Sequence, residues 1–409
     1  MRINKKMIFG IVTFLWLIVM FAQRNLYPLS PHSDLNAFQI PWWEYLNGHG
    51  FHGILNINHD INGNYGPIWY FTIVVLCKLG VYSALPTVWC IKILAGIFTF
   101  LSAWAMAVLM RVIIGDKVWN DVLAYTLVLF SPVFLGDIFK TNLPDSSFFL
   151  FSILAIVAVF KQKHWLSWFW VGVAVSFKAM GIYVTPFLAF FYLRDFKKMS
   201  LWARLSPLMT VIGMAICALP AIILGEHPFM AMFGNIMTRS GGLSKRDFGI
   251  LKLIDGGSWV WFPNLNHAQK VEMQLAGIAV LALIFLGLYL MIYLIPKLSQ
   301  QNEALLYLLV ASPMLCWLFL PAQHETYFNI AGVFAIILVG VHPNLKHWLI
   351  LLMTNFLVWS GYHGFRQGVN QVFCTYLLIG LILYLVFEIV RLSNMDVFLA
   401  NSSNKLGRM

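Results

Sequence analysis

Long runs of apolar residues recur along almost the whole chain, and they limit what it can fold into. Leu85–Ile114 and Val372–Val390 are examples, and each is long enough to cross a lipid bilayer as a helix. Of the 409 residues, 60% are hydrophobic and only 11% are charged, which is too little charge for a soluble surface. Because backbone amides inside a bilayer must be hydrogen-bonded within helices, the sequence predicts an all-α polytopic membrane protein.

The basic residues between the apolar runs predict the orientation. The N-terminus carries Lys5 and Lys6, and the short connections carry Lys163 and Lys197. If Ile68–Leu76 lies on the outer face instead of crossing, all these charges fall on the cytoplasmic side, as the positive-inside rule favours. The expected membrane helices are 7–22, 85–114, 122–139, 146–160, 165–177, 181–193, 201–224, 271–295, 305–320, 328–341, 348–361 and 372–390.

This arrangement predicts a cell-membrane protein of roughly twelve crossings with both termini in the cytoplasm. It is one integral membrane domain over residues 1–409, with extracytoplasmic loops at 23–66 and 225–270. The net charge of +11 could indicate nucleic acid as a partner, but the lysines and arginines are spread singly and form no basic face. We therefore expect membrane lipids, and no nucleic acid, as partners.

The loop at 23–66, called the first loop below, is the most polar stretch of an otherwise apolar chain. It holds Asp34, shortly before Trp42, in a position where a carboxylate could accept a proton from a hydroxyl at the membrane surface. Capping of a short interfacial helix is an equally weighted reading of Asp34. The spacing of His49, His52 and His59 is too loose to favour a zinc site, so no metal-binding residues are predicted.

Two further candidates lie at the ends of predicted membrane helices. Asp145 could be a second carboxylate that holds acceptor hydroxyls or a divalent cation such as Mg²⁺ or Mn²⁺, or it could simply cap its helix. Lys178 breaks an apolar run, and its ammonium group could bind an anionic phosphate. The alternative for Lys178 is a lysine that extends to the membrane surface.

The later part of the chain adds a polar sequence, Gln323-His324-Glu325-Thr326-Tyr327, at the start of a predicted helix. His324 and Glu325 could bind a leaving phosphate or sugar hydroxyls, or they could form interfacial hydrogen bonds. Arg239, in the loop at 225–270, could attract a diphosphate or lipid head groups, or could belong to a solvated loop.

Taken in order, these motifs resemble the GT-C superfamily of polyprenyl-phosphate-sugar-dependent glycosyltransferases, and most closely its mannosyltransferase-like bacterial branches. Asp34 matches the essential acid of the first outer loop, and Asn64-Tyr65-Gly66-Pro67 matches an Asn-Tyr-x-Pro element. Asp145 matches a later outer acid without the Trp-Gly-Gln that often precedes it, and Lys178 matches a lysine at a helix break without the following proline. In His324-Glu325-Thr326-Tyr327, Thr replaces the Arg of the usual motif.

The resemblance implies a GT-C-like bundle with juxtamembrane helices in the first loop. It also implies an inverting transfer from a polyprenyl-phosphate-linked sugar to a glycan, lipid or protein acceptor outside the cytoplasm. Asp34 and Asp145 are the expected catalytic residues, and Lys178, His324 and Arg239 the expected phosphate-binding residues. Substrate contacts are expected from Trp42, Asn64, Tyr65, Glu325 and Tyr327. A transporter or flippase of lipid-linked sugars and a glycan polymerase or ligase stay open as alternatives.

Overall fold

The computed structural model describes residues 4–27, 30, 33–63, 65–115, 119–141, 145–237, 244–246, 250, 267–295, 297–320, 323–362 and 369–393. Nearly all of these residues are helical, so the predicted all-α fold is confirmed apart from one pair of very short strands. The chain forms two compact units. The first comprises Met1–Leu188, Phe196–Ser240 and Val339–His342, and the second Ala189–Asp195, Gly241–Leu338 and Pro343–Met409. That residues 1–409 form a single integral membrane domain stays a prediction.

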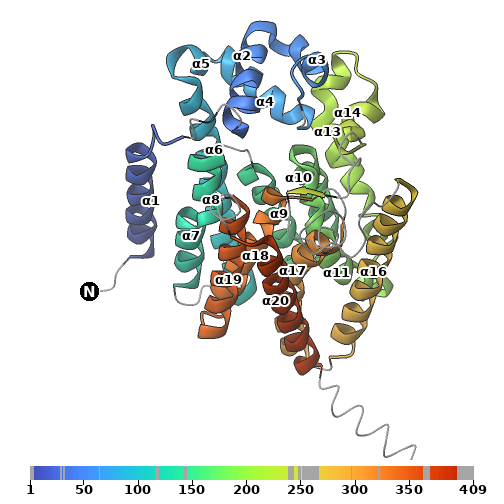
Figure 1. The fold of residues 1–409 in the computed structure, drawn as a ribbon. Coiled ribbons are helices and arrows are strands. Elements are labelled where there is room, and N and C mark those ends of the chain that lie inside the picture. Colours follow the sequence, from blue (N-terminus) through green and yellow to red (C-terminus); the bar gives the residue numbers. More distant parts are fainter. Residues whose placement is uncertain are drawn as a thin grey trace, which may run out of the picture. The chain divides into compact units, whose positions relative to one another are not determined.

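The first unit contains most of the shorter helices (Figure 1). They are α1 (Lys5–Ala22), α2 (Ile40–His49), α3 (Gly53–Asp60), α4 (Pro67–Lys78), α5 (Val81–Ala84), α6 (Thr87–Ile114), α7 (Asn120–Phe130), α8 (Pro132–Gly136), α9 (Asp145–Phe160), α10 (His164–Phe177), α12 (Leu201–Arg204), α13 (Leu208–Ile223) and α14 (Pro228–Met237). Segments Leu35–Gln39 and Asp137–Thr141 are π-helical, and Gly50–His52, Ala179–Val184 and Phe196–Lys198 are 3₁₀-helical. Helix α11 (Thr185–Asp195) begins in this unit.

The second unit is built around long helices. They are α16 (His267–Tyr293), α17 (Leu298–Phe319), α18 (Asn329–Val341), α19 (Leu345–Tyr362) and α20 (Gln371–Leu392), with α17 packed against α16 and α20. Strand β1 (Ser244–Arg246) pairs in parallel with β2 (Gln323–His324), and a 3₁₀ helix, Glu325–Phe328, connects β2 to α18.

Among the described residues, six helices are long and apolar enough to cross a membrane. These segments are Lys5–Ala22, Thr87–Ile114, Asn120–Phe139, Val271–Tyr293, Gln300–Phe319 and Gln371–Leu392. Shorter apolar helices cover Pro67–Lys78, Asp145–Phe160, Leu208–Ile223 and Thr326–Val341. The chain therefore has the helices of a membrane-embedded protein, while the count of about twelve crossings stays a prediction.

One predicted helix, 122–139, is interrupted in the structure. Helix α7 ends at Phe130, and α8 starts afresh at Pro132. Proline has no backbone N–H to continue the ladder, so it begins a helix more readily than it extends one. The segment then passes into the π-helical turn Asp137–Thr141, and this turn brings the buried side chain of Asp137 into the first unit.

Helices α2 and α3 lie within the first loop, and α4 packs against both of them (Figure 1). A buried stripe holds the group together: Leu35, Trp43 and Leu46 are completely buried, and Trp42 is 1% exposed. With Gln39, which is also completely buried, Leu35, Trp43 and Leu46 recur at intervals of three or four residues, which is the spacing of one helix face. The first loop is therefore a folded helical layer, as the predicted juxtamembrane helices require.

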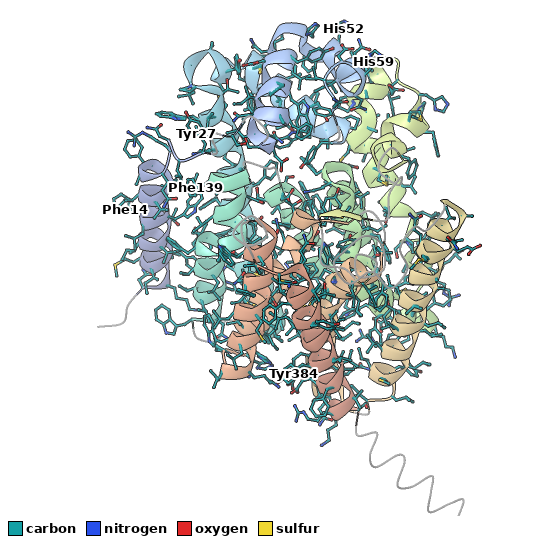
Figure 2. All side chains as sticks on the ribbon, in the orientation of Figure 1. Phe14, Tyr27, His52, His59, Phe139 and Tyr384 are labelled. Carbon is teal, nitrogen blue, oxygen red and sulfur yellow. The ribbon has the colours of Figure 1, made fainter. Side chains whose placement is uncertain are left out.

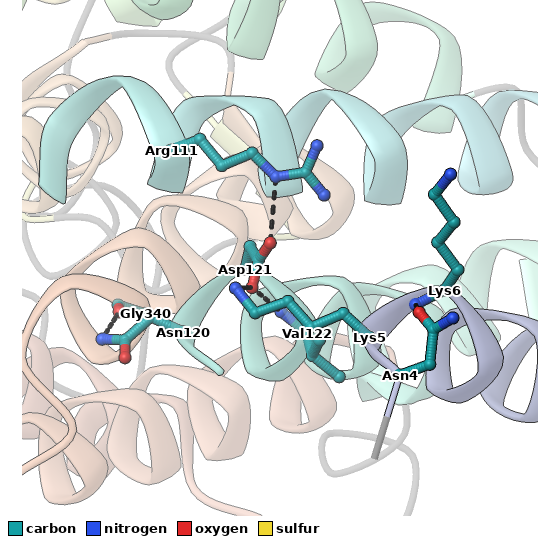
Figure 3. Close-up of polar contacts among 8 residues, drawn as sticks. All are labelled: Asn4, Lys5, Lys6, Arg111, Asn120, Asp121, Val122 and Gly340. Atoms are coloured by element: carbon teal, nitrogen blue, oxygen red, sulfur yellow. Dashed lines mark hydrogen bonds and ion pairs between the residues drawn. The ribbon is translucent and has the colours of Figure 1, made fainter. Parts of the chain in front are cut away.

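Helix α1 contacts the rest of the first unit along a narrow face. Only Phe9 and Trp16 are buried among its described residues, and Phe14 projects away from its neighbours (Figure 2). At its N-terminal end, the Lys5 ammonium lies 3.2 Å from a carboxylate oxygen of Asp121 on α7 (Figure 3). The Nε of Arg111 on α6 lies 2.9 Å from the other oxygen of the same carboxylate. One buried acid thus joins α1, α6 and α7.

The other end of α1 is held by a buried lysine of α6. The Lys92 ammonium donates hydrogen bonds to the backbone carbonyls of Gln23, Arg24 and Leu26, at 3.1, 2.9 and 2.5 Å. These carbonyls belong to the turn that ends α1, where the last helical carbonyls have no partner within the helix. Lys92 therefore fixes the point at which the first loop begins.

Candidate active site

A buried ion pair between Asp145 and Lys178 forms the centre of the candidate site. Asp145 is the first residue of α9 and is completely buried. Lys178 lies at the break between α10 and the 3₁₀ segment Ala179–Val184, and its side chain is 3% exposed. The Lys178 ammonium donates a hydrogen bond to the Asp145 carboxylate. Charges buried at this depth cost desolvation energy and mark candidate functional sites in membrane proteins.

The end of the first loop packs directly on the C-terminal end of α10, beside this pair. A Cβ atom on Gly66 would lie 1.9 Å from the backbone carbonyl oxygen of Ser176, so only glycine allows this approach. Pro67 then begins α4. The contact places the ring centroid of Tyr65 5.9 Å from the ammonium nitrogen of Lys178. The predicted element around Tyr65 thus reaches the predicted lysine.

Aromatic contacts extend from Tyr65 back into the first loop. The rings of Trp42 and Tyr65 meet edge to face with centroids 5.4 Å apart, and Trp42 lies 5.7 Å from Tyr70. The Tyr70 hydroxyl accepts a hydrogen bond of 2.8 Å from the backbone N–H of Tyr65. Four predicted residues, Trp42, Tyr65, Asp145 and Lys178, are therefore linked by consecutive contacts within the first unit.

Asp34 starts the helical segment that leads into α2, and its side chain is half-buried. Among the described residues, the first turn of that segment donates no capping hydrogen bond to the Asp34 carboxylate. The Ser33 hydroxyl instead accepts one from the Asn36 N–H at 3.3 Å. Asp34 thus lies at the N-cap position of the segment, and its catalytic and capping interpretations both stay predictions. Asp34, Phe38 and Trp42 follow at intervals of four residues, which places them on similar sides of the helix.

The remaining predicted site residues belong to the second unit or lie outside the described residues. His324 belongs to β2, and Glu325 and Tyr327 to the 3₁₀ helix that follows it, all in the second unit. Asn64 and Arg239 lie outside the described residues.

Sequence reasoning missed two buried polar residues of the first unit. Gln39 ends the π-helical segment after Asp34, is completely buried, and its amide has no hydrogen-bond partner among the described residues. Asp137 is also completely buried, in the other π-helical segment. The sequence does carry a signal for Gln39, because it stands within an apolar stripe. Trp42 and Trp43, which follow it by three and four residues, are core residues.

Tyr45, His59 and Asp60 form a polar cluster on the exposed side of the first loop, where Figure 2 labels His59. The Tyr45 hydroxyl donates a 2.5 Å hydrogen bond to Asp60, and the imidazole of His59 lies 3.0 Å from the same carboxylate. These two contacts hold the pKa of Asp60 below its ordinary value. Partial burial and the carboxylate of Asp60 raise the pKa of Tyr45 to about 12. Among the described residues, no three His, Cys, Asp or Glu gather as a metal site.

No protein-family model matches this chain, and no match is found among curated proteins.

Proposed function

We propose that this protein is a membrane glycosyltransferase of the GT-C kind. It would transfer a sugar, with inversion, from a polyprenyl-phosphate donor to a glycan, lipid or protein hydroxyl on the extracytoplasmic face. The observation that carries the proposal is the buried Asp145–Lys178 pair in contact with Tyr65. Three segments distant in sequence meet there, and each carries a residue that the motif resemblance had already selected.

The proposed chemistry is a single displacement at the anomeric carbon of the donor sugar. The acceptor oxygen forms a bond to that carbon, the bond from the carbon to the phosphate oxygen breaks, and the electron pair leaves with the phosphate. Asp34 accepts the acceptor proton as general base. Lys178 is the cation that meets the phosphate, in a charge-assisted hydrogen bond. Asp145 holds the Lys178 ammonium in place through their hydrogen bond, and it is also the proposed contact for the acceptor hydroxyls.

The remaining predicted residues complete the proposal. Tyr65 provides aromatic surface for the donor sugar next to Lys178, and Trp42, which meets Tyr65 edge to face, is a further proposed substrate contact. His324 and Arg239 are proposed phosphate contacts, and Glu325, Tyr327 and Asn64 proposed sugar contacts, on the strength of the motif resemblance. A divalent cation at Asp145 remains an expectation from the sequence, and no step above uses one.

The role of Asp34 is tested by Asp34→Asn, assayed as sugar transfer from a synthetic polyprenyl-phosphate donor by the purified protein. The expected result is a loss of turnover of about a hundred- to ten-thousand-fold with donor binding and unfolding temperature unchanged, because Asn keeps the shape and loses the base. Glu44→Gln, which alters an exposed acid of the same loop, is the matched control and keeps full activity. Near-normal turnover of Asp34→Asn removes Asp34 from the mechanism.

The role of Lys178 is tested with variants that distinguish the effect of its charge on donor binding from its effect on stability. Lys178→Ala is expected to raise the donor KM and to lower stability by about 3 kcal/mol, because it leaves the Asp145 carboxylate buried without its cation. The double variant Asp145→Asn with Lys178→Met removes both charges and is expected to recover stability without recovering activity. A double variant with a normal donor KM contradicts the phosphate-binding role.

A flippase of lipid-linked sugars is the second candidate, because Lys178 lies at a broken helix and transporters build binding sites at such breaks. Reconstituted vesicles separate the two candidates. Movement of a polyprenyl-phosphate sugar between leaflets without formation of a glycoside favours the flippase, and glycoside formation favours the transferase.

A further inference from the structure

Several buried polar atoms of the first loop and the start of α4 have no hydrogen-bond partner among the described residues. The side chains of Gln39, Trp42 and Trp69 are at most 1% exposed. Both polar atoms of the Gln39 amide and the indole nitrogens of Trp42 and Trp69 have no hydrogen-bond partner among the described residues. Buried polar atoms are nearly always hydrogen-bonded in folded proteins, so a set of four in one place calls for an explanation.

The two tryptophans lie beside Tyr65. The ring centroids of Trp42 and Trp69 lie 5.4 and 6.3 Å from that of Tyr65. Gln39 precedes Trp42 by three residues, one helical turn, so the two side chains lie on adjacent parts of the same helix face. Because the Tyr65 ring also lies 5.9 Å from the Lys178 ammonium, this group adjoins the proposed reaction site.

Burial of these polar side chains without hydrogen bonds lowers the stability of the folded protein. A buried amide that makes no hydrogen bond destabilises the fold, and a methionine would fill nearly the same space without that penalty. Folding gains nothing from the Gln39 amide in the contacts described. A ligand that hydrogen-bonds to it would satisfy the amide.

We infer that Gln39, Trp42 and Trp69 form a subsite for a sugar ring of the acceptor. An amide offers one donor group and one acceptor oxygen, which match two neighbouring hydroxyls of a sugar. The indole N–H groups add donors, and the aromatic faces suit the apolar face of a pyranose ring. A serine side chain or a lipid alcohol presents a single hydroxyl and would leave most of these groups unsatisfied. The inference rests on the proposed function and narrows its acceptor to a glycan.

The test compares Gln39→Met with the wild-type full-length protein in detergent. The first measurement is the unfolding temperature, alone and with a panel of methyl hexopyranosides as probes. The expected result is an unfolding temperature equal to or above that of the wild type, together with loss of the shift that the glycoside causes. In the transfer assay, the acceptor KM rises roughly ten-fold while the donor KM stays the same, as expected for one or two lost hydrogen bonds.

Thr99→Val is the matched control. Thr99 on α6 is completely buried and its hydroxyl has no partner among the described residues, and valine has nearly the same shape. This variant is expected to keep the glycoside shift and the acceptor KM, so it shows whether removal of any buried polar group has the same effect.

The outcomes separate the inference from the proposed function. A Gln39→Met variant that keeps the glycoside shift and the wild-type acceptor KM overturns the inference and leaves the transferase proposal intact. Failure of Gln39→Met to fold also overturns it, because Gln39 would then be structural. If the wild type transfers sugar from none of the polyprenyl-phosphate donors tested, the proposed function fails, while loss of the glycoside shift in Gln39→Met still supports the sugar subsite.

Discussion

At the scale of single residues, the Tyr45–Asp60 hydrogen bond connects α2 to the end of α3 on the exposed side of the first loop. The pKa values of its two members are shifted in opposite directions. The depressed pKa of Asp60 means that the fold favours the carboxylate, so this contribution to stability is present above its ordinary pKa and is lost as pH falls through the folded value. The raised pKa of Tyr45, about 12, means that the fold favours the neutral phenol.

The pH dependence of unfolding follows from the directions of these two pKa shifts. The contribution of Tyr45 is complete below its ordinary pKa of about 10 and is lost as pH rises from there to about 12. We expect the unfolding temperature to fall along this alkaline limb in the wild type and to fall less in Tyr45→Phe. Tyr82→Phe, which alters a tyrosine of α5 that stacks on Trp43 of the first loop, keeps the wild-type profile. Identical profiles for wild type and Tyr45→Phe contradict the assignment.

At the scale of helices and loops, the approach of Gly66 to the end of α10 decides whether the first loop meets Lys178. The backbone carbonyl of Ser176 occupies the space that any side chain at this position would need. The contact is therefore a property of two backbones, and no change of rotamer can relieve a side chain placed there.

Gly66→Ala is expected to lower the stability of the protein by about 1–3 kcal/mol and to reduce sugar transfer, because the loop must move away from α10. Gly48→Ala is the control: a Cβ at Gly48 meets nothing within 4 Å, and alanine in a helix is favoured over glycine by about 0.5–1 kcal/mol. Thermal unfolding and transfer rates of both variants check the prediction. Equal activity of the two variants contradicts the positioning role of this contact.

The helices follow from the sequence more closely than the site does. The predicted runs 146–160 and 165–177 differ from α9 and α10 by one residue each, since uninterrupted apolar runs can satisfy their backbone only as helices. Asp145 and Lys178 were each identifiable as charges at helix ends, but their pairing depends on how α9 and α10 pack, which periodicity does not encode. The Gly66 contact is likewise a tertiary feature, because it depends on Ser176, which is distant in sequence.

At the scale of the whole molecule, the distribution of charge predicts which end of the helices faces the cytoplasm. Lys161 and Lys163 are exposed in the turn between α9 and α10, and Glu44 is exposed in the first loop. The positive-inside rule places the first two in the cytoplasm and the first loop outside.

Cysteine labelling in intact cells with an impermeant reagent tests this orientation. Glu44→Cys is expected to be labelled and Lys163→Cys to be labelled only after the membrane is opened. Of the five native cysteines, four are buried and Cys77 is half-buried, so the unsubstituted protein provides the background. Labelling of Lys163→Cys from outside, with none of Glu44→Cys, reverses the topology and removes the extracytoplasmic site.

The sparse packing of α1 has a consequence for biosynthesis. Helix α1 is apolar, and only 11% of it is buried against the rest of the protein. Because its backbone is hydrogen-bonded within the helix, it is stable in lipid without partners once it has been inserted. Its anchors, Asp121 on α7 and Lys92 on α6, belong to helices that are synthesised later. Helix α1 is therefore an independent membrane segment until α6 has been inserted, and only then is the start of the first loop fixed.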